Sequence, residues 1–232
     1  MHRILSVVLI LILSASGCVE TSFTSARKRV ENMAASGRRL SRPVIFIHGW
    51  MDYPIRFDPM LNALRRAASN DQAYIYVHRL SGSGPIHQLA AIVGGRYRHL
   101  GPVDVVAHGM GGLVAREAAR RYGLQIHTLY SLAVPHLGGR FAPIISKLHD
   151  QAREMMPGSD FLKTLNADPA SRGFRSISFR LKDDQHVSAD SAGYLGGEIY
   201  EFQREVLEDA HVNLPEDPRV IEIVINNLLS EN

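Results

Sequence analysis

Histidines and acidic residues occur in this chain directly after apolar stretches, at positions where their side chains could transfer protons. His48 follows one such stretch, and the adjacent acids Asp183 and Asp184 follow another. His211 stands just before the last helical segment of the chain. Imidazole and carboxylate groups are the common general acids and bases of enzymes, so these residue types indicate proton transfer as the chemistry to look for.

The elements that must position these residues alternate between short β-branched runs and stretches with helical spacing. Strands separated by helices of about ten to fifteen residues predict βαβ units and a mostly parallel sheet of about six strands, flanked by helices on both faces. In such a sheet, functional residues gather at the C-terminal ends of the strands. The predicted strands are 43–47, 73–77, 103–107, 126–134, 173–181 and 205–207, and the predicted helices are 59–68, 86–100, 110–122, 142–156 and 218–229.

The composition supports a folded α/β domain. The 232 residues are 45% hydrophobic and 21% charged, which allows a sizeable core and excludes wholesale disorder. The single cysteine, Cys18, excludes a disulfide framework and any zinc site built from several cysteines. The histidines show no paired ligand spacing, so we predict no metal and no other cofactor.

Residues 103–116, with the sequence VDVVAHGMGGLVAR, carry the most informative motif of the chain. They resemble the nucleophile elbow of the α/β-hydrolases, in particular of small bacterial lipases and esterases, where the pattern is G-x-S-x-G. In that elbow the nucleophile stands on a sharp turn between a strand and a helix, between small flanking residues. Ala107 and Gly111 match these flanks, and the resemblance places Gly109 where the nucleophilic serine is expected. It also implies that His108 points away from the pocket.

Residues 46–50, with the sequence FIHGW, resemble the oxyanion loop of the same family. Acyl transfer creates an alkoxide, and two fixed main-chain N–H groups must point at it to stabilise it. The resemblance assigns these two donors to Trp50 and to Met110, the residue after the nucleophile position.

The family order of nucleophile, acid and histidine implies roles for residues nearer the C-terminus. Family members carry an acid followed three residues later by an apolar residue, which selects Asp184, with Asp183 as the alternative; His211 matches the histidine. Further matches extend the resemblance over essentially all of residues 43–232. Within them, 135–172 corresponds to the region where the family places lids, and its apolar residues could line an acyl pocket or belong to the core.

The nucleophile itself is missing. Gly109 has no hydroxyl group, and neither neighbour in the sequence supplies a replacement. Covalent acyl-enzyme catalysis of the usual kind is therefore not available to the chain as written. Glycine avoids most of the strain that the elbow imposes on other residues, about 1–3 kcal/mol, so we expect the fold to be intact.

Three functions remain open on this basis. The first is a lipase-like protein that binds an acyl ester or another lipid-like ligand but is catalytically impaired. The second is an active carboxylic ester hydrolase in which Gly109 is a variant or an engineered replacement of serine. The apparent retention of Asp184 and His211 favours this second function. The third is a non-catalytic interaction scaffold that uses the fold only as a surface.

Residues 1–17 have the features of a bacterial secretory signal. Arg3 supplies a positive charge, and residues 4–13 form an apolar stretch that is shorter than the about 20 residues a membrane-spanning helix needs. The small residues before Cys18 resemble a lipobox, which implies a lipidated Cys18. The resemblance then places the protein in the bacterial envelope, anchored to the outer membrane and facing the periplasm. An ordinary secretory signal is the alternative.

Positive charge is concentrated in residues 18–42, which we interpret as a basic tether that leads to the domain 43–232. Six basic and two acidic residues lie between Val19 and Arg42, whereas the domain has a net charge of −2. A basic segment next to a membrane suits an anionic lipid surface, and a solvated linker is the alternative. Because no basic patch with interleaved aromatic residues occurs, nucleic acid binding is not predicted.

Overall fold

The computed structural model describes residues 22–34, 37–68, 74–81, 84–140, 142–147, 149–203 and 210–230. The predicted signal peptide and Cys18 lie outside these residues. No helix in the described ranges is long and apolar enough to cross a membrane.

Six parallel strands form one sheet, in the order β2-β1-β3-β4-β5-β6. Every residue of the neighbouring inner strands β1 and β3 is buried, as the continuous β-branched runs predict. The predicted parallel sheet is therefore confirmed. The strands are β1 (Val44–Ile47), β2 (Ile75–His78), β3 (Val103–His108), β4 (Ile126–Leu132), β5 (Arg175–Leu181) and β6 (Glu198–Phe202).

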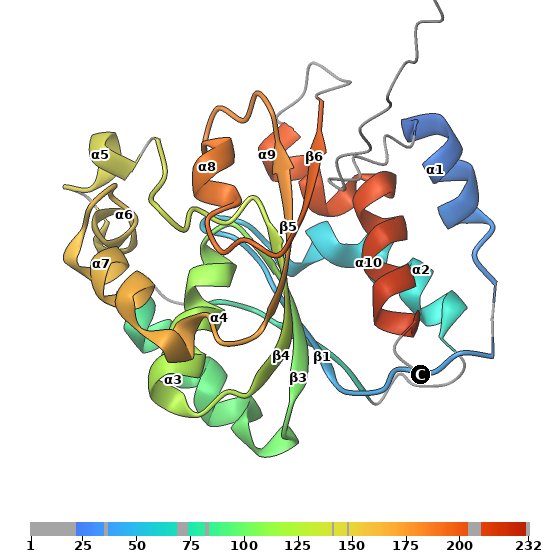
Figure 1. Ribbon diagram of the computed structural model, residues 1–232, viewed down its shortest axis with the longest axis horizontal. Helices are drawn as coiled ribbons and strands as arrows, with labels where there is room; N and C mark the ends of the chain where they lie inside the picture. The colour runs from blue at the N-terminus through green and yellow to red at the C-terminus, as the bar shows by residue number, and fades with distance from the viewer. Residues whose placement is uncertain are drawn as a thin grey trace, which may run out of the picture.

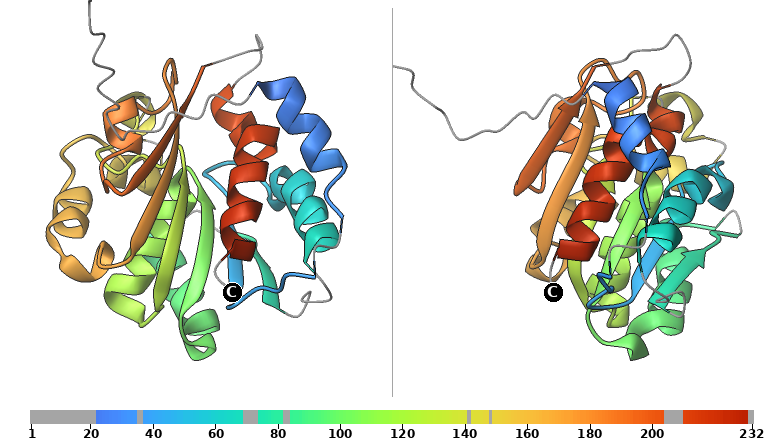
Figure 2. Two further views of the ribbon diagram at one scale, coloured as in Figure 1. Left: turned by 45° about the vertical axis from the view of Figure 1, so that its right-hand side comes forward. Right: turned by 90° about the vertical axis from the view of Figure 1, so that its right-hand side faces the viewer.

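Helices cover both faces of the sheet (Figures 1 and 2). One face carries α3 (Ile86–Tyr97) and α4 (Met110–Tyr122), which pack against each other, and the other carries α2 (Asp58–Ala67) and α10 (Pro218–Ser230). Two hydrophobic clusters fill the spaces between these layers and the sheet. The resulting three-layer arrangement holds the strand ends, and the loops that follow them, on a rigid base.

Short elements occupy many of the connections between the strands and the long helices. They comprise the four α-helices α5 (Ala142–Ile145), α6 (Asp150–Glu154), α8 (Ala189–Ala192) and α9 (Ala210–Asn213), the longer α7 (Asp160–Ala167), and the 3₁₀ turns η1 (Pro54–Phe57), η3 (Arg98–Leu100), η4 (Pro169–Ser171) and η5 (Leu214–Glu216). The single helix expected over 142–156 is thus divided into α5 and α6. The Ser146 hydroxyl donates to the carbonyl of Pro143 at 3.2 Å. This side-chain bond competes with the main-chain hydrogen bond that would continue the helix, and α5 ends at the residue before Ser146.

The sixth strand lies earlier in the chain than the sequence indicated. β6 is Glu198–Phe202, whereas the expected strand over 205–207 lies outside the described residues. As an edge strand it buries only Phe202, and its two glutamates weaken the apolar signal on which the sequence prediction depended. β4 also ends two residues before the expected 134, because Ala133 adopts a φ of 45°.

Part of the segment interpreted as a basic tether is helical. α1 (Phe23–Glu31) buries Ala26 and Val30 and packs against α10. The Arg29 guanidinium also forms an ion pair with Glu222 of that helix. The folded unit described by the structure therefore includes α1, which lies before the domain boundary at residue 43.

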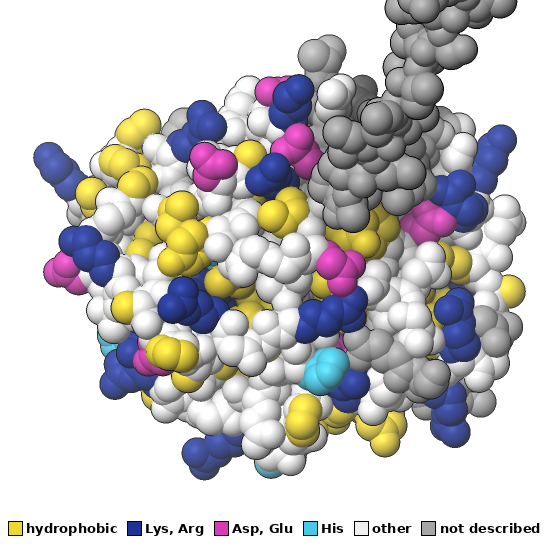
Figure 3. Space-filling view, viewed as in Figure 1, with side chains coloured by type: hydrophobic (Ala, Val, Ile, Leu, Met, Phe, Trp, Pro, Cys, Tyr) yellow, Lys and Arg dark blue, Asp and Glu magenta, His cyan; other side chains and the backbone are white. Residues whose placement is uncertain are grey.

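The region expected to hold a lid combines exposed and buried apolar residues. Ile144 is 74% exposed, and Figure 3 shows hydrophobic side chains on the surface over α5 and beside α8. Leu162 and Leu165 of α7, in contrast, belong to the core cluster under α3 and α4. Only part of the 135–172 segment thus lies outside the hydrophobic core.

Candidate active site

The turn between β3 and α4 has the sharp geometry of a nucleophile elbow. Gly109 joins the two elements with a φ of 50° and a ψ of −126°, a conformation that side-chain-bearing residues rarely adopt. Its N–H donates to the carbonyl of Leu132 in β4 at 3.0 Å, which fixes the turn to the neighbouring strand. A nucleophile at this position would stand at the C-terminal edge of the sheet.

The space beside Gly109 accommodates a side chain. A Cβ atom built on this residue would lie 3.7 Å from Cα of Gly49 and 3.8 Å from Nε2 of His211. Both separations are ordinary van der Waals contacts. A serine hydroxyl at this position would therefore come within hydrogen-bonding reach of the His211 ring without displacing its neighbours.

The structure brings Asp184 and His211 together. Nδ1 of His211 donates to Oδ2 of Asp184 at 2.8 Å. The other carboxylate oxygen accepts from the main-chain N–H groups of His186 at 2.7 Å and Val187 at 3.0 Å. Asp183 is exposed and Asp184 is buried, so the alternative acid does not take this position.

These contacts keep Asp184 ionised and fix the orientation of the His211 ring. Burial raises the pKa of Asp184, but the hydrogen bonds from His211 and from the two amides outweigh it and hold the pKa below its usual value. Asp184 is therefore ionised at neutral pH and orients the His211 ring with Nδ1 protonated. The lone pair of Nε2 then faces Gly109.

The two expected oxyanion donors flank the same point. Trp50 and Met110 both line the cavity at Gly109, and no hydrogen bond within the described residues occupies the main-chain N–H of either one. The Trp50 ring is held in place because its Nε1 donates to Oε1 of Gln151 at 2.8 Å. His48 has a structural role: Nδ1 donates to the Gly49 carbonyl, and Nε2 accepts from the N–H of Leu80.

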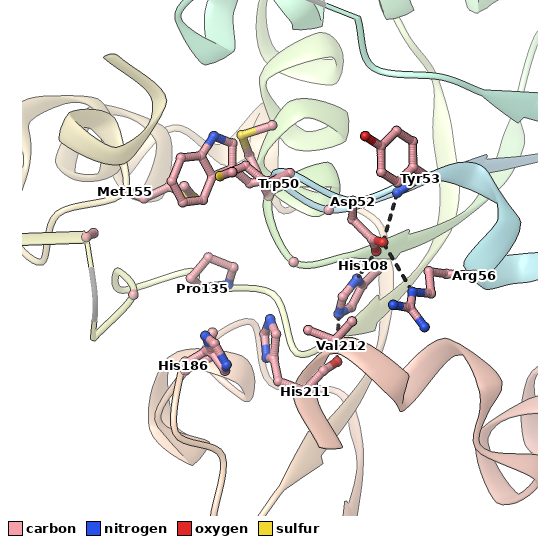
Figure 4. Close-up of a pocket in the computed structure, with 17 residues that line it drawn as sticks. Trp50, Asp52, Tyr53, Arg56, His108, Pro135, Met155, His186, His211 and Val212 are labelled. Carbon is pink, nitrogen blue, oxygen red and sulfur yellow. Dashed lines mark hydrogen bonds and ion pairs between the residues drawn. The ribbon is translucent and has the colours of Figure 1, made fainter. Parts of the chain in front are cut away.

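A second histidine–aspartate pair lies beside the first, and sequence reasoning missed it. Nδ1 of His108 is 3.3 Å from Oδ2 of Asp52, and Nε2 of His108 is 3.0 Å from the main-chain oxygen of His211. Arg56 extends the network, with contacts to Asp52 at 3.4 Å and to Glu216 at 2.9 Å. Figure 4 shows that this network approaches His211 from the side opposite His186.

The expectation that His108 points away from the pocket is therefore wrong. His108 is one of the residues that line the cavity, and its buried ring points at Asp52, which supplies an acceptor in the loop after β1. Burial lowers the pKa of His108, while the contact with Asp52 opposes that shift. Asp52 lies two residues after Trp50, so the available signal was its position just beyond the expected oxyanion loop.

The cavity in front of Gly109 has a volume of about 400 Å³. Apolar side chains form much of its wall, among them Pro135, Met155 and Val187. Among the described residues that line it, none is a serine, threonine, cysteine or lysine. Within the described part of the chain, no group of three or more His, Cys, Asp or Glu residues could hold a metal ion.

Comparisons of the chain with known proteins agree with this architecture. No protein-family model matches the chain, and no curated protein sequence matches it. Solved structures do match. The mature lipase BlEst2 of Bacillus licheniformis superposes with a TM-score of 0.64 at 12% identity, over 85% of this chain and 95% of that one.

Two further structures have similar coverage. A monoacylglycerol lipase of Paleococcus ferrophilus gives a TM-score of 0.58 at 13% identity, over 83% of this chain and 97% of its own. A lipase-esterase related protein of Clostridium acetobutylicum gives 0.56 at 11% identity, over 84% and 97%. At these identities the likeness concerns the fold. The six-stranded parallel sheet, the elbow at Gly109 and these neighbours together establish that the chain has the α/β-hydrolase fold of lipases and esterases.

Proposed function

We propose that this protein is a lipase-like lipoprotein of the bacterial envelope that binds acyl esters and lacks covalent catalysis. The observation that carries the proposal is the geometry at Gly109. The elbow, the Asp184–His211 pair and the cavity are present, but the residue at the nucleophile position has no hydroxyl group. The solved lipases and esterases with the same fold support an acyl ligand.

The apolar cavity supports an acyl chain as the ligand. Ligand sites are commonly apolar clefts with a few convergent polar groups, and here the polar groups are the Trp50 and Met110 amides and the His211 ring. The amides would bind the carbonyl oxygen of an ester, and the wall around Met155 would contact its acyl chain.

The Gly109→Ser variant tests the proposal. Because the space beside Gly109 accommodates the side chain, we expect hydrolysis of short-chain nitrophenyl esters to rise by at least about 100-fold, or about 2.7 kcal/mol of barrier. A serine-directed fluorophosphonate should label this variant and leave the unmodified protein unlabelled. Labelling of the unmodified protein at any residue of the cavity would rule out the loss of covalent catalysis.

Ligand binding has its own readout. Trp50 is the single tryptophan of the chain and lines the cavity, so its fluorescence reports on occupancy. A nitrophenyl alkyl ether, which resembles the ester but has no scissile acyl bond, should quench this fluorescence in a saturable manner. An unchanged signal at all ether concentrations would favour the interaction scaffold.

An active carboxylic ester hydrolase is the second candidate. The 2.8 Å contact between His211 and Asp184 favours it, because a binding protein has no need of an oriented base. In that case Gly109 is a variant or an engineered replacement of serine, and the Gly109→Ser variant restores the original activity.

The envelope location rests on Cys18 and the residues around it. A lipidated cysteine at the start of the mature chain would anchor the protein in the membrane, and several acyl chains together give stable anchoring. Replacement Cys18→Ser should move the protein into the soluble fraction of fractionated cells. Retention in the membrane fraction would exclude an acyl anchor at this residue.

A further inference from the structure

We propose that the cavity hydrolyses activated acyl compounds, such as aryl esters and thioesters, by direct attack of water, with His211 as the general base. No acyl-enzyme forms on this route. The inference rests on the proposed function in one respect, that the cavity accepts acyl compounds. It adds a slow activity that the loss of serine leaves in place.

The first support is the room next to the base. Nε2 of His211 is 3.8 Å from the ideal Cβ position of Gly109, and Cα of Gly49 is 3.7 Å from that position. A serine side chain fits there, and its two heavy atoms take up more space than one water molecule. A water that lies in this space would be in hydrogen-bonding reach of Nε2.

The second support is the state and position of the base. Because Nδ1 of His211 donates to Asp184, the neutral ring carries its lone pair on Nε2 and can accept a proton there. His211 stands on α9, a helix of only four residues that has little stability of its own. Contacts from His108 to the His211 carbonyl, and from Arg56 to Asn213 at 3.2 Å, hold this helix in place.

The third support is the pair of free amides. Trp50 and Met110 line the cavity together with Gly109, where the carbonyl oxygen of a bound acyl compound would gain negative charge during attack. α4 also begins at Met110, so the positive end of its dipole points at the same place. These donors belong to the main chain and do not depend on the residue type at position 109.

The reaction balances without any further reactant. The water oxygen forms a bond to the acyl carbon, its proton passes to Nε2 of His211, and the carbonyl electron pair moves to the oxygen. Collapse of this intermediate breaks the bond to the leaving group, which departs as an aryloxide or thiolate and takes the proton from His211. The products are a carboxylic acid and a phenol or thiol.

The expected substrates follow from the missing covalent step. In serine hydrolases that lose a catalytic residue, the oxyanion donors and substrate binding still give about 10³–10⁴-fold acceleration over water. An acceleration of this size makes turnover measurable only where the leaving group is good. Aryl esters and thioesters meet that condition better than alkyl esters.

The experiment uses the unmodified full chain, first treated with a fluorophosphonate that silences contaminating serine hydrolases. We expect nitrophenyl butyrate to be hydrolysed at least about 100-fold more slowly than by Gly109→Ser, linearly from the first turnover and without a burst. The replacement His211→Gln should lower this rate at least tenfold. The same fluorophosphonate should abolish the activity of Gly109→Ser.

His78→Gln is the matched control, because His78 is also a buried histidine but lies beside Tyr97, away from the cavity. It should leave the rate unchanged, and thermal unfolding should show that both histidine variants fold. A rate equal to that of buffer, a rate that survives His211→Gln, or a rate removed by the fluorophosphonate overturns the water route. Quenching of Trp50 fluorescence by the ether distinguishes the proposed function from the water route. Quenching without His211-dependent turnover contradicts the water route alone. Absence of quenching contradicts the proposed function.

Discussion

Gly109 and Gly111 lie two residues apart in the same turn, yet they are glycines for different physical reasons. A Cβ on Gly111 would lie 2.4 Å from the carbonyl oxygen of Ile47, and one on Gly112 would lie 2.4 Å from the side chain of Val134. A Cβ on Gly109 would meet nothing closer than 3.7 Å. Packing therefore requires the two glycines that bring α4 onto the sheet, whereas only the positive φ favours glycine at 109.

This difference shows that the packing of the elbow and the presence of a nucleophilic hydroxyl group depend on different positions. The close approach of α4 to β1 depends on Gly111, and the packing of α4 against Val134 depends on Gly112. The hydroxyl group depends on position 109 alone. A chain can therefore lose the nucleophile and keep the rest of the site, which is the state of this protein.

The replacement Gly111→Ala should give the largest loss of stability. The added methyl group would clash with main-chain oxygens of β1, which cannot rotate away, so we expect unfolding to become about 3 kcal/mol more favourable. Urea unfolding measures the change. Gly95→Ala is the control: Gly95 lies in α3 with nothing within 4 Å of its Cβ position, and the replacement should stabilise the protein by about 0.5–1 kcal/mol.

The replacement Gly109→Ala should have a smaller effect. Here the cost arises from the positive φ and not from a clash, and it amounts to about 1–2 kcal/mol in the same urea experiment. If Gly109→Ala and Gly111→Ala destabilise equally, crowding and not backbone conformation governs both positions, and the comparison above fails.

The acidic residues around Gly109 should make the stability depend on pH. Interactions with histidines hold the pKa values of Asp184 and Asp52 below their usual values, although burial acts in the opposite direction. A carboxylate with a lowered pKa stabilises the fold above its unfolded pKa of about 4, and this stabilisation is lost as the pH falls through the folded pKa. Urea unfolding between pH 7 and pH 3 should show this acid loss.

Two variants test whether the pH dependence of stability arises at the site. Asp52→Asn should lower the stability at pH 7 by about 1–2 kcal/mol and flatten the dependence below pH 5, since its contacts with His108 and Arg56 are weakened. Asp160→Asn is the control, because Asp160 is fully exposed. An acid dependence that is identical in all three proteins would place its origin away from the site.

The regular part of the fold was predictable from the sequence. The buried runs at 44–47 and 103–108 and the helix 110–122 have strong periodic signals, and the structure places them within a residue or so of the expected bounds. The edge strand β6 and the division into α5 and α6 were not predictable. An exposed strand carries little apolar signal, and a side-chain hydrogen bond that ends a helix has no periodicity.

The sequence by itself determined that position 109 has no nucleophile, since the residue type alone decides whether a hydroxyl group exists. Its resemblance to α/β-hydrolases also selected the residues that the structure brings together. Only the tertiary structure decided that Asp184 and not Asp183 contacts His211, and that His108 and Asp52 face the cavity. Such choices depend on which side of a loop is buried, and burial is set by elements that are distant in the chain and adjacent in space.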